Sequence, residues 1–351
     1  MKHEAMIYHS VTATRLGPPS VLQIVENDLR APGPKEARIR VLAASVSRPD
    51  ITVRSGEALY TGTPLGQKVP FTPGYAVIGD VEAVGVEVTG VSAGDRVGVL
   101  TVVGGYSEVL YWRSDRLIPV PRTVNPAEAV TLILNYLVAW QTMHRSAKVK
   151  AGEKMLIIGA SGGIGTALLQ LGRLAGLTMY GVASASKHWM MLAAGATPID
   201  YHTQDFFEFI RRVEPAGIDV VIDGTTRLDT IRSSLSLLRR GGRVVSYGEP
   251  ASPGDLPRIL GTLMREKLTP DGKSFTLYGT SSYFLGNRRP YEQDWATLFH
   301  LLETRQIAPV IMRKFPILEA ARANELLESG TVVGNVVLVA PELLNGDASS
   351  S

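Results

Sequence analysis

The sequence contains no cysteine among its 351 residues. This absence excludes disulfide bonds, thiolate nucleophiles, and zinc or iron–sulfur centres that depend on cysteine ligands. The six histidines show no His-x-x-x-His spacing, so the sequence does not indicate a metal site of histidines and carboxylates either. We therefore expect any chemistry that this chain performs to be free of metal.

The sequence also has little excess charge and no long hydrophobic run. A net charge of +3 gives no support to a role on nucleic acid or on an anionic membrane. The most hydrophobic stretch, residues 129–140, is shorter than the ~20 residues of a transmembrane helix. The first residues lack the apolar segment of a signal peptide. These absences predict a cytoplasmic enzyme with no nucleic-acid partner and no stable membrane insertion.

The pattern of short elements predicts two domains. Residues 1–125 show valine-rich runs separated by glycine and proline, the pattern of a small β-barrel or sandwich. Residues 126–284 open with the helix start Asn125-Pro126 and then alternate apolar strands with helices. Such alternation is typical of an α/β fold with a doubly wound parallel sheet. The expected strands begin near Lys154, Leu177, Ile218, Gly242 and Phe275.

The tail, residues 285–351, differs from both parts. It reads as a helix (291–304), a strand (309–315), a second helix (318–329) and a closing strand (335–339), and the last residues from 346 are expected to be disordered. Our hypothesis is that this tail completes the first domain, so that the active site lies in a cleft between the two domains.

A glycine-rich turn carries the strongest functional signal. The segment Gly159-Ala160-Ser161-Gly162-Gly163-Ile164-Gly165 follows an apolar strand and opens a helix, which is the context of a dinucleotide-binding fingerprint. Ala160 permits the tight turn, Gly162 lets the backbone approach a pyrophosphate, and Gly165 lets the helix pack on the sheet. The N-terminus of the helix then offers free N–H groups and a positive dipole end to the phosphates.

The type of dinucleotide follows from a second absence. An NAD-binding site usually carries an acid about 20 residues beyond the glycines, which binds the 2′-hydroxyl of the ribose. No Asp or Glu occurs between Gly165 and Asp200. Ser184 and Lys187 stand there instead, and a hydroxyl with an ammonium group suits a 2′-phosphate. The sequence therefore predicts NADPH as the cofactor.

Taken together, these features resemble the medium-chain dehydrogenase/reductase superfamily, and within it the zinc-independent quinone oxidoreductase-like branch. The chain is also similar to the VAT-like reductases of that branch. The resemblance runs from about residue 5 to 340. It rests on segments at residues 46–50, 54–56, 70–74, 93–97 and 104–108, on the glycine turn with 168–171, and on 195–201, 238–243 and 333–338.

The resemblance implies a GroES-like barrel for residues 1–125 with the tail, and a six-stranded Rossmann domain for residues 126–284. It implies that Lys187 and Tyr201 flank the 2′-phosphate and that Gly248 lies near the nicotinamide. Asn335 is assigned to the cofactor on the same ground. The resemblance also implies a homodimer formed through the last Rossmann strand, and exposed apolar residues within 275–284 would suit that pairing.

The departures from the zinc-dependent relatives are as informative. Those relatives place a cysteine ligand near the position of Ser47 and a histidine ligand near Tyr75, and neither residue is present here. Alcohol oxidation through a zinc alkoxide is therefore not expected. Members of the branch often carry other residues at the positions of Ser47, Thr52 and Val138. The resemblance therefore does not define the substrate pocket of this chain.

We expect hydride transfer from NADPH to a quinone or to an activated C=C bond, in an enone, alkenal or enoyl thioester. A hydroxyl group would polarise the carbonyl or protonate the enolate. The candidates for this catalytic role are Tyr75, Tyr60 and Ser47, with Asn135 as a further polar residue. Asp50 is expected to support its loop, by capping a helix.

The sequence argues against one alternative function and leaves two others open. A short-chain dehydrogenase is set aside, because no tyrosine has a lysine four residues further on. A non-catalytic NADPH-binding protein stays open, because family residues at Ser47, Thr52 and Val138 are lost. An enoyl reductase that acts on carrier-bound acyl chains also stays open, and a basic docking patch would support it.

Overall fold

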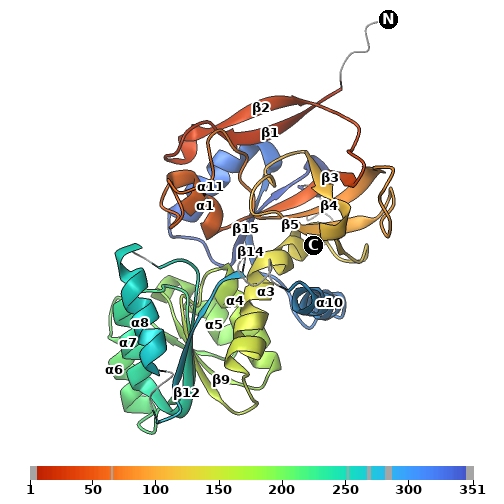
Figure 1. The fold of residues 1–351 in the computed structure, drawn as a ribbon. Helices are drawn as coiled ribbons and strands as arrows, with labels where there is room; N and C mark the ends of the chain where they lie inside the picture. The colour runs from red at the N-terminus through yellow and green to blue at the C-terminus, as the bar shows by residue number, and fades with distance from the viewer. Residues whose placement is uncertain (1–5, 65, 251–252, 267–269, 281–286, 345–351) are drawn as a thin grey trace, which may run out of the picture. The chain divides into compact units, whose positions relative to one another are not determined.

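The structure is a computed structural model that describes residues 6–64, 66–250, 253–266, 270–280 and 287–344 (Figure 1). The chain forms two compact units, and each is described by itself. Unit 1 comprises Met1–Leu134 with Trp295–Ser351, and unit 2 comprises Asn135–Asp294. The sequence placed the boundaries at 125/126 and 284/285. Because helix α2 (Pro126–Thr131) packs on β3, β4 and β15, it belongs to unit 1.

Unit 1 is built on a mixed sheet whose long central strand is β3 (Glu36–Val46). Among the described residues, seven strands join in this sheet, and β1 (Ile7–Ala13) pairs separately with β2 (Leu22–Asp28). The strand β15, from the C-terminal tail, lies between β14 and β3 and runs antiparallel to β3. The remaining bounds are β4 (Ala76–Val84), β5 (Arg96–Leu100), β6 (Val109–Arg113), β7 (Ile118–Pro119), β14 (Ile311–Pro316) and β15 (Asn335–Val339).

Two helices of unit 1 are tied together by a buried arginine. Arg54, in α1 (Arg48–Ser55), is fully buried and forms an ion pair with Glu328, in α11 (Ala320–Glu328). Its guanidinium also donates to the carbonyl oxygen of Gly17. The N-terminal and C-terminal segments of the chain are therefore linked by a charge that has little water around it.

Unit 2 contains a parallel sheet with the strand order β10-β9-β8-β11-β12-β13, six strands within the described residues. The order reverses between β8 and β11, as in a doubly wound Rossmann sheet, which confirms the predicted fold class. Apolar side chains dominate the central strands because both faces of the sheet are covered. The bounds are β8 (Lys154–Ile158), β9 (Thr178–Val182), β10 (Thr197–Ile199), β11 (Ile218–Asp223), β12 (Leu238–Tyr247) and β13 (Ser274–Tyr278).

Helices cover both faces of this sheet. Figure 1 shows α6 (Phe206–Val213), α7 (Leu228–Leu237) and α8 (Leu256–Glu266) on one face. On the other face lie α4 (Gly163–Leu174), α5 (His188–Ala193) and α3 (Leu137–Trp140). This division follows from right-handed crossovers that run in opposite directions from the centre of the sheet. Short π-helical segments flank α3, and α10 (Arg289–Glu303) runs across the boundary between the units.

Two expectations about the surface are corrected or limited here. Phe275 and Tyr278 are only 4% exposed, so these two residues of β13 do not supply the exposed apolar surface that was predicted, whereas Leu277 is partly exposed. The rest of the predicted exposed segment, 281–284, and the predicted disordered end, 346–351, lie outside the described residues.

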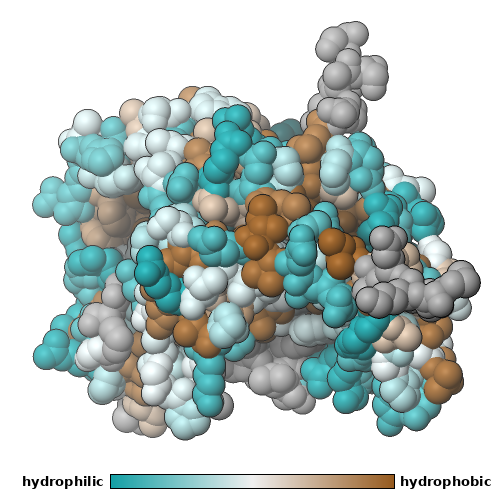
Figure 2. Space-filling view, turned by 90° about the horizontal axis from the view of Figure 1, so that it is seen from above, coloured by the Kyte–Doolittle hydropathy of each residue, from teal (hydrophilic) through white to brown (hydrophobic). Residues whose placement is uncertain are grey.

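Seen from the side of β1 and β2, hydrophobic patches alternate with hydrophilic side chains (Figure 2). Within the described residues, no helix has the length and apolarity that spanning a membrane requires.

The buried pair makes a stability prediction. We expect Arg54→Ala to lower the free energy of unfolding by about 3 kcal/mol or more, because Glu328 loses its partner and a fully buried side chain is removed. Arg40→Ala is the matched control, since Arg40 pairs with Glu342 at the surface and should cost less than about 1 kcal/mol. Urea denaturation of both variants measures the difference, and equal losses would contradict the account.

Candidate functional site

The predicted glycine turn lies at the carboxyl edge of the sheet of unit 2. It leaves β8 at Gly159, whose φ of +89° is favourable only for glycine, and α4 begins at Gly163. The N–H of Ala160 donates to the carbonyl of Val182 at 3.1 Å, which holds the turn against β9. A Cβ atom on Gly165 would stand 2.3 Å from the carbonyl oxygen of Gly159. Gly165 therefore has to be glycine for α4 to pack on the turn, as predicted.

The outer side of the same turn is open. A Cβ atom on Gly162 would have only one neighbour within 4 Å, the Gly159 carbonyl oxygen at 3.8 Å. The N–H of Thr166 donates to the carbonyl of Gly162, so the N–H groups of Gly163 and Ile164 come before the first N–H that donates within the helix. Open space, free helix N–H groups and the positive dipole end together fit a phosphate group. These features, with Ser161 in the turn, match what a dinucleotide requires.

Other predicted nucleotide residues follow neighbouring strands on the same edge. Ser184 and Lys187 come directly after β9, and the N–H of Lys187 donates to the Ser184 carbonyl at 2.9 Å. Partial burial lowers the pKa of Lys187, since it disfavours the ammonium form. Tyr201, after β10, is 52% exposed, and its ring contacts that of His202 in a tilted arrangement. Gly248, after β12, has a φ of +93° and open space around its Cα.

Asn335 differs from these residues because it belongs to unit 1. It is 4% exposed at the start of β15, and its side-chain amide donates to the carbonyl of Val310 at 2.9 Å. The structure thus gives Asn335 a local role in joining β15 to the preceding segment. Its assignment to the cofactor stays a prediction.

Sequence reasoning missed a buried carboxylate at the reversal of the strand order. Asp223 ends β11 and is fully buried. One of its oxygens accepts from the N–H and hydroxyl of Thr225, and the other accepts from the N–H of Thr226 and the hydroxyl of Ser246. Burial raises the pKa of Asp223, although these donors oppose the effect. The carboxylate therefore clamps the loop after β11 to β12.

The same clamp positions Tyr247, the last residue of β12. The hydroxyl of Thr226 donates to the Tyr247 carbonyl at 2.8 Å, and Thr226 has a positive φ of +48°. The phenol oxygen of Tyr247 would lie 2.5 Å from a Cβ atom on Gly224, and the N–H of Gly224 donates to Ile158 at the end of β8. A hydroxyl group thus reaches from β12 across the end of β11. Polar residues at the carboxyl ends of buried strands, here Asp223 and Tyr247, were the available sequence signal.

A second polar cluster lies in unit 1, around Asp50. Ser47 precedes α1, and its N–H and hydroxyl donate to one carboxylate oxygen of Asp50 at 2.8 and 2.5 Å. The other oxygen accepts from the N–H of Gly74 at 3.0 Å. The expected capping role of Asp50 is confirmed by these bonds. Because Asp50 is 2% exposed, burial raises its pKa from 3.8 to about 6.

Residues from distant parts of the chain complete this cluster. The hydroxyl of Tyr106, which is fully buried, hydrogen-bonds to Asp50, and burial raises the pKa of Tyr106 well above its ordinary value. The side-chain amide of Asn324, in α11, donates to the same hydroxyl at 3.4 Å. Neither contact was predicted, because 218 positions separate Tyr106 from Asn324 and no local pattern joins them.

The three predicted catalytic residues have different surroundings. Asp50 brings Ser47 close to the backbone of Gly74, which precedes Tyr75. The Tyr75 carbonyl accepts from Thr101 at 2.9 Å and from Val102, whose φ of +68° is a strained conformation for a β-branched residue.

Tyr75 is only 7% exposed. Tyr60 is half-buried against the core of unit 1, and its carbonyl accepts from Thr63, so it anchors its loop. Asn135 is 9% exposed in a π-helical segment.

The positions that hold zinc in other dehydrogenases carry Ser47 and Tyr75, and the Ser47 hydroxyl is bound to Asp50. Across the described ranges, no group of three or more histidines, aspartates or glutamates is arranged to hold a metal ion. The donor set at these two positions, a hydroxyl and a phenol, does not fit the nitrogen and sulfur ligands that zinc prefers.

Comparison with known proteins defines the class. Residues 33–122 match the family model of the alcohol dehydrogenase GroES-like domain, and residues 194–338 match that of the zinc-binding dehydrogenases. A quinone oxidoreductase of Pongo abelii is 30% identical over 340 residues, which cover 95% of this chain and 98% of that protein. The chain therefore belongs to the medium-chain dehydrogenase/reductase superfamily of oxidoreductases and, within it, to the zinc-independent quinone oxidoreductase-like branch.

Two further comparisons agree with this placement. The synaptic vesicle membrane protein VAT-1 homolog of Rattus norvegicus is 38% identical over 220 residues, which cover 62% of this chain and 53% of that protein. The matched region thus spans about half the length of that relative. A solved quinone oxidoreductase of Pseudomonas syringae superposes with a TM-score of 0.82 at 28% identity, covering 95% of this chain and 99% of the other. A nicotinamide cofactor is consistent with both the family and the glycine turn.

The pKa of Asp50 predicts a pH dependence with a definite sign. Because the pKa of Asp50 is raised in the folded chain, its carboxyl group takes up a proton on folding between pH 4 and 6. Its contribution to the free energy of unfolding is therefore lost as the pH rises through this range. The loss amounts to about 3 kcal/mol at pH 7. We expect the stability of the wild type, relative to Asp50→Asn, to fall over this range in urea titrations.

Asp229→Asn is the control for this titration. The hydrogen bond from Arg227 lowers the pKa of Asp229, so its contribution has the opposite sign and is small at the surface. A wild-type profile parallel to that of Asp50→Asn between pH 4 and 7 would contradict the assignment.

Proposed function

We propose that this chain is an NADPH-dependent, zinc-independent oxidoreductase that reduces a quinone or an activated C=C bond of an enone, alkenal or enoyl thioester. The observation that carries the proposal is the carboxyl edge of the unit 2 sheet. There the open turn at Gly162 adjoins β9, whose end is followed by Ser184 and Lys187 and by no acid.

The residues that would hold the cofactor have distinct tasks. The backbone from Ala160 to Ile164 would bind the pyrophosphate, because helix N–H groups and the dipole favour anions. Lys187 and Ser184 would bind the 2′-phosphate, with Tyr201 beside them. Partial burial disfavours the charge of Lys187, and an adjacent phosphate would restore it. Gly248 leaves room for the nicotinamide end.

When bound, NADPH supplies the hydride; the protein supplies position, electrostatics and a proton. Tyr75 is our first candidate for the proton donor or for polarising the substrate carbonyl, because it stands at the position of a metal ligand. Its carbonyl accepts from Thr101, and the preceding Gly74 is held by Asp50 and Thr101. The hydroxyl of Ser47 already donates to Asp50, which favours a positioning role for Ser47. Tyr60 is the remaining candidate.

Charge reversal at Lys187 tests the cofactor. We expect the wild type to have a much higher kcat/KM with NADPH than with NADH, and Lys187→Glu to raise the KM for NADPH at least tenfold, since an acid repels the 2′-phosphate. The KM for NADH should change little. Lys150→Glu, on the loop before β8, is the matched control. A wild-type preference for NADH would refute the cofactor assignment.

Removal of one hydroxyl tests the proton donor. We expect Tyr75→Phe to leave the Kd for NADPH unchanged and to lower kcat/KM by about 10²-fold, the usual scale of general acid catalysis. Tyr60→Phe should retain turnover when Tyr75 is the donor, and a comparable loss of kcat/KM in Tyr60→Phe would assign the role to Tyr60 instead. The assay is NADPH oxidation with a panel of quinones, alkenals and enoyl thioesters. Full activity of Tyr75→Phe would eliminate Tyr75, and NADPH binding without turnover across the panel would favour the non-catalytic alternative.

A further inference from the structure

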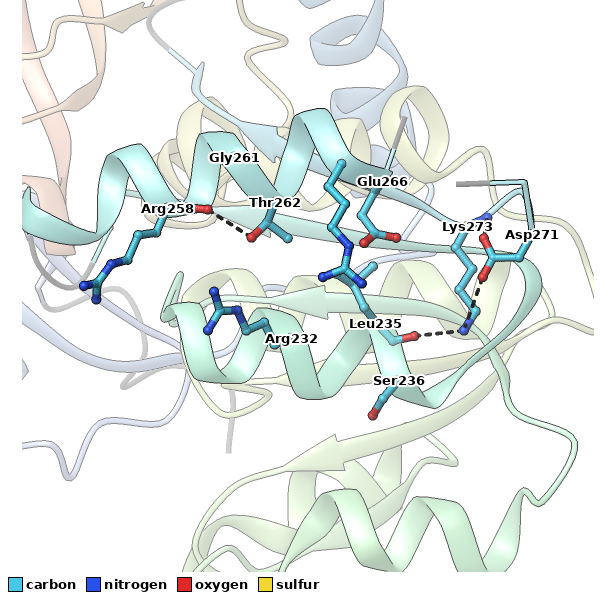
Figure 3. A pocket seen from close by; sticks show the side chains of 10 residues that line it. Arg232, Leu235, Ser236, Arg258, Gly261, Thr262, Glu266, Asp271 and Lys273 are labelled. Atoms are coloured by element: carbon cyan, nitrogen blue, oxygen red, sulfur yellow. Dashed lines mark hydrogen bonds and ion pairs between the residues drawn. The ribbon is translucent and has the colours of Figure 1, made fainter. Parts of the chain in front are cut away.

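A groove separate from the glycine turn lies between α7 and α8 (Figure 3). Its volume is about 600 Å³, within the range of sites that bind small molecules. Because α7 and α8 cover the sheet face opposite to α4, the groove is not part of the nucleotide turn. Leu235 contributes an apolar side chain to its lining, and Ser236 and Thr262 contribute hydroxyls.

Positive charge is concentrated at one end of this groove. Arg232 comes from α7 and Arg258 from α8, both are exposed, and their side chains extend toward the same end (Figure 3). Within the part of the chain that the structure describes, neither guanidinium forms an ion pair with a carboxylate. At the other end, Lys273 is paired with Asp271 at 3.7 Å and donates to the Leu235 carbonyl. An anion is thus favoured at the arginine end.

A glycine inside α8 keeps the groove open. Gly261 lines the groove, and a Cβ atom there would meet nothing within 4 Å, so packing does not demand glycine. Glycine within a helix is nevertheless less stable than alanine, because it loses more backbone freedom on folding. The hydroxyl of the next residue, Thr262, bonds back to the Arg258 carbonyl at 3.0 Å. The wall of the groove at Gly261 is therefore formed by the backbone of α8. The glycine lowers the stability of the helix, and packing within the chain does not require it.

We propose that the groove between α7 and α8 binds a small molecule that carries a phosphate or diphosphate group. Arg232 and Arg258 bind the phosphate oxygens, because a planar guanidinium offers paired donors that match phosphate geometry. Leu235 and the open wall at Gly261 contact the organic part of the molecule. Inorganic phosphate would contact only the two arginines. A phosphorylated metabolite or nucleotide would contact both the arginines and the wall at Leu235 and Gly261.

Calorimetric titration with inorganic pyrophosphate tests the arginine end. We expect saturable binding that persists in the presence of saturating NADPH, and a Kd that rises about tenfold or more in Arg232→Gln and in Arg258→Gln. Arg173→Gln, an exposed arginine on α4, is the matched control and should change the Kd by less than twofold. Equal weakening in all three variants, or the absence of saturable binding, would overturn the proposal.

Two substitutions at Gly261 separate folding from binding. Gly261→Ala and Gly261→Leu should both raise the melting temperature, because each removes a glycine from a helix. Gly261→Ala should keep adenosine 5′-diphosphate binding measured with the glycine turn saturated by NADPH, whereas Gly261→Leu should lose it by filling the groove. If the chain does not bind NADPH at all, the dependence on Arg232 and Arg258 still decides the proposal. Unchanged binding in Gly261→Leu would refute it.

Discussion

The close packing of α4 on the turn that leaves β8 is the constraint on which the candidate site depends. With no room for a side chain at Gly165, the helix comes near enough for its first N–H groups to line an open turn. The parallel sheet then brings the ends of β9, β10 and β12 to the same edge, each followed by residues that suit part of a dinucleotide. One steric requirement thus defines where the phosphates of the proposed cofactor would bind, and the strand order brings the other proposed contacts to the same edge.

Unit 1 depends in a similar way on a buried charge. The carboxylate of Asp50 collects hydrogen bonds from Ser47, Gly74 and Tyr106, and these bonds hold the segment that carries Tyr75. Burial makes this charge costly, so the cluster keeps it only because every oxygen has donors. The positions of the metal ligands in the zinc-dependent relatives are therefore occupied by residues held in place by hydrogen bonds to one carboxylate.

Local patterns predicted much of this arrangement from the sequence. The glycine turn, the alternation of strands and helices, the helix start at Asn125 and the closing strand 335–339 are all encoded within short segments, and the structure has them at nearly the predicted positions. Contacts between distant residues were not predictable in this way. The bond between Tyr106 and Asn324, the ion pair of Arg54 with Glu328 and the clamp of Asp223 on Ser246 exist only after the strands have been placed.

Hydride transfer from C4 of the cofactor to carbon can be followed with an isotopic label. The enzyme would be incubated with an α,β-unsaturated ketone and NADPH carrying deuterium at one of the two C4 positions. Because the nucleotide would be held in one orientation, we predict that one of the two labelled cofactors delivers deuterium to carbon in the reduced ketone. The other labelled cofactor should deliver hydrogen. A product without deuterium from either cofactor, or no product at all across enones, alkenals and quinones, would contradict it.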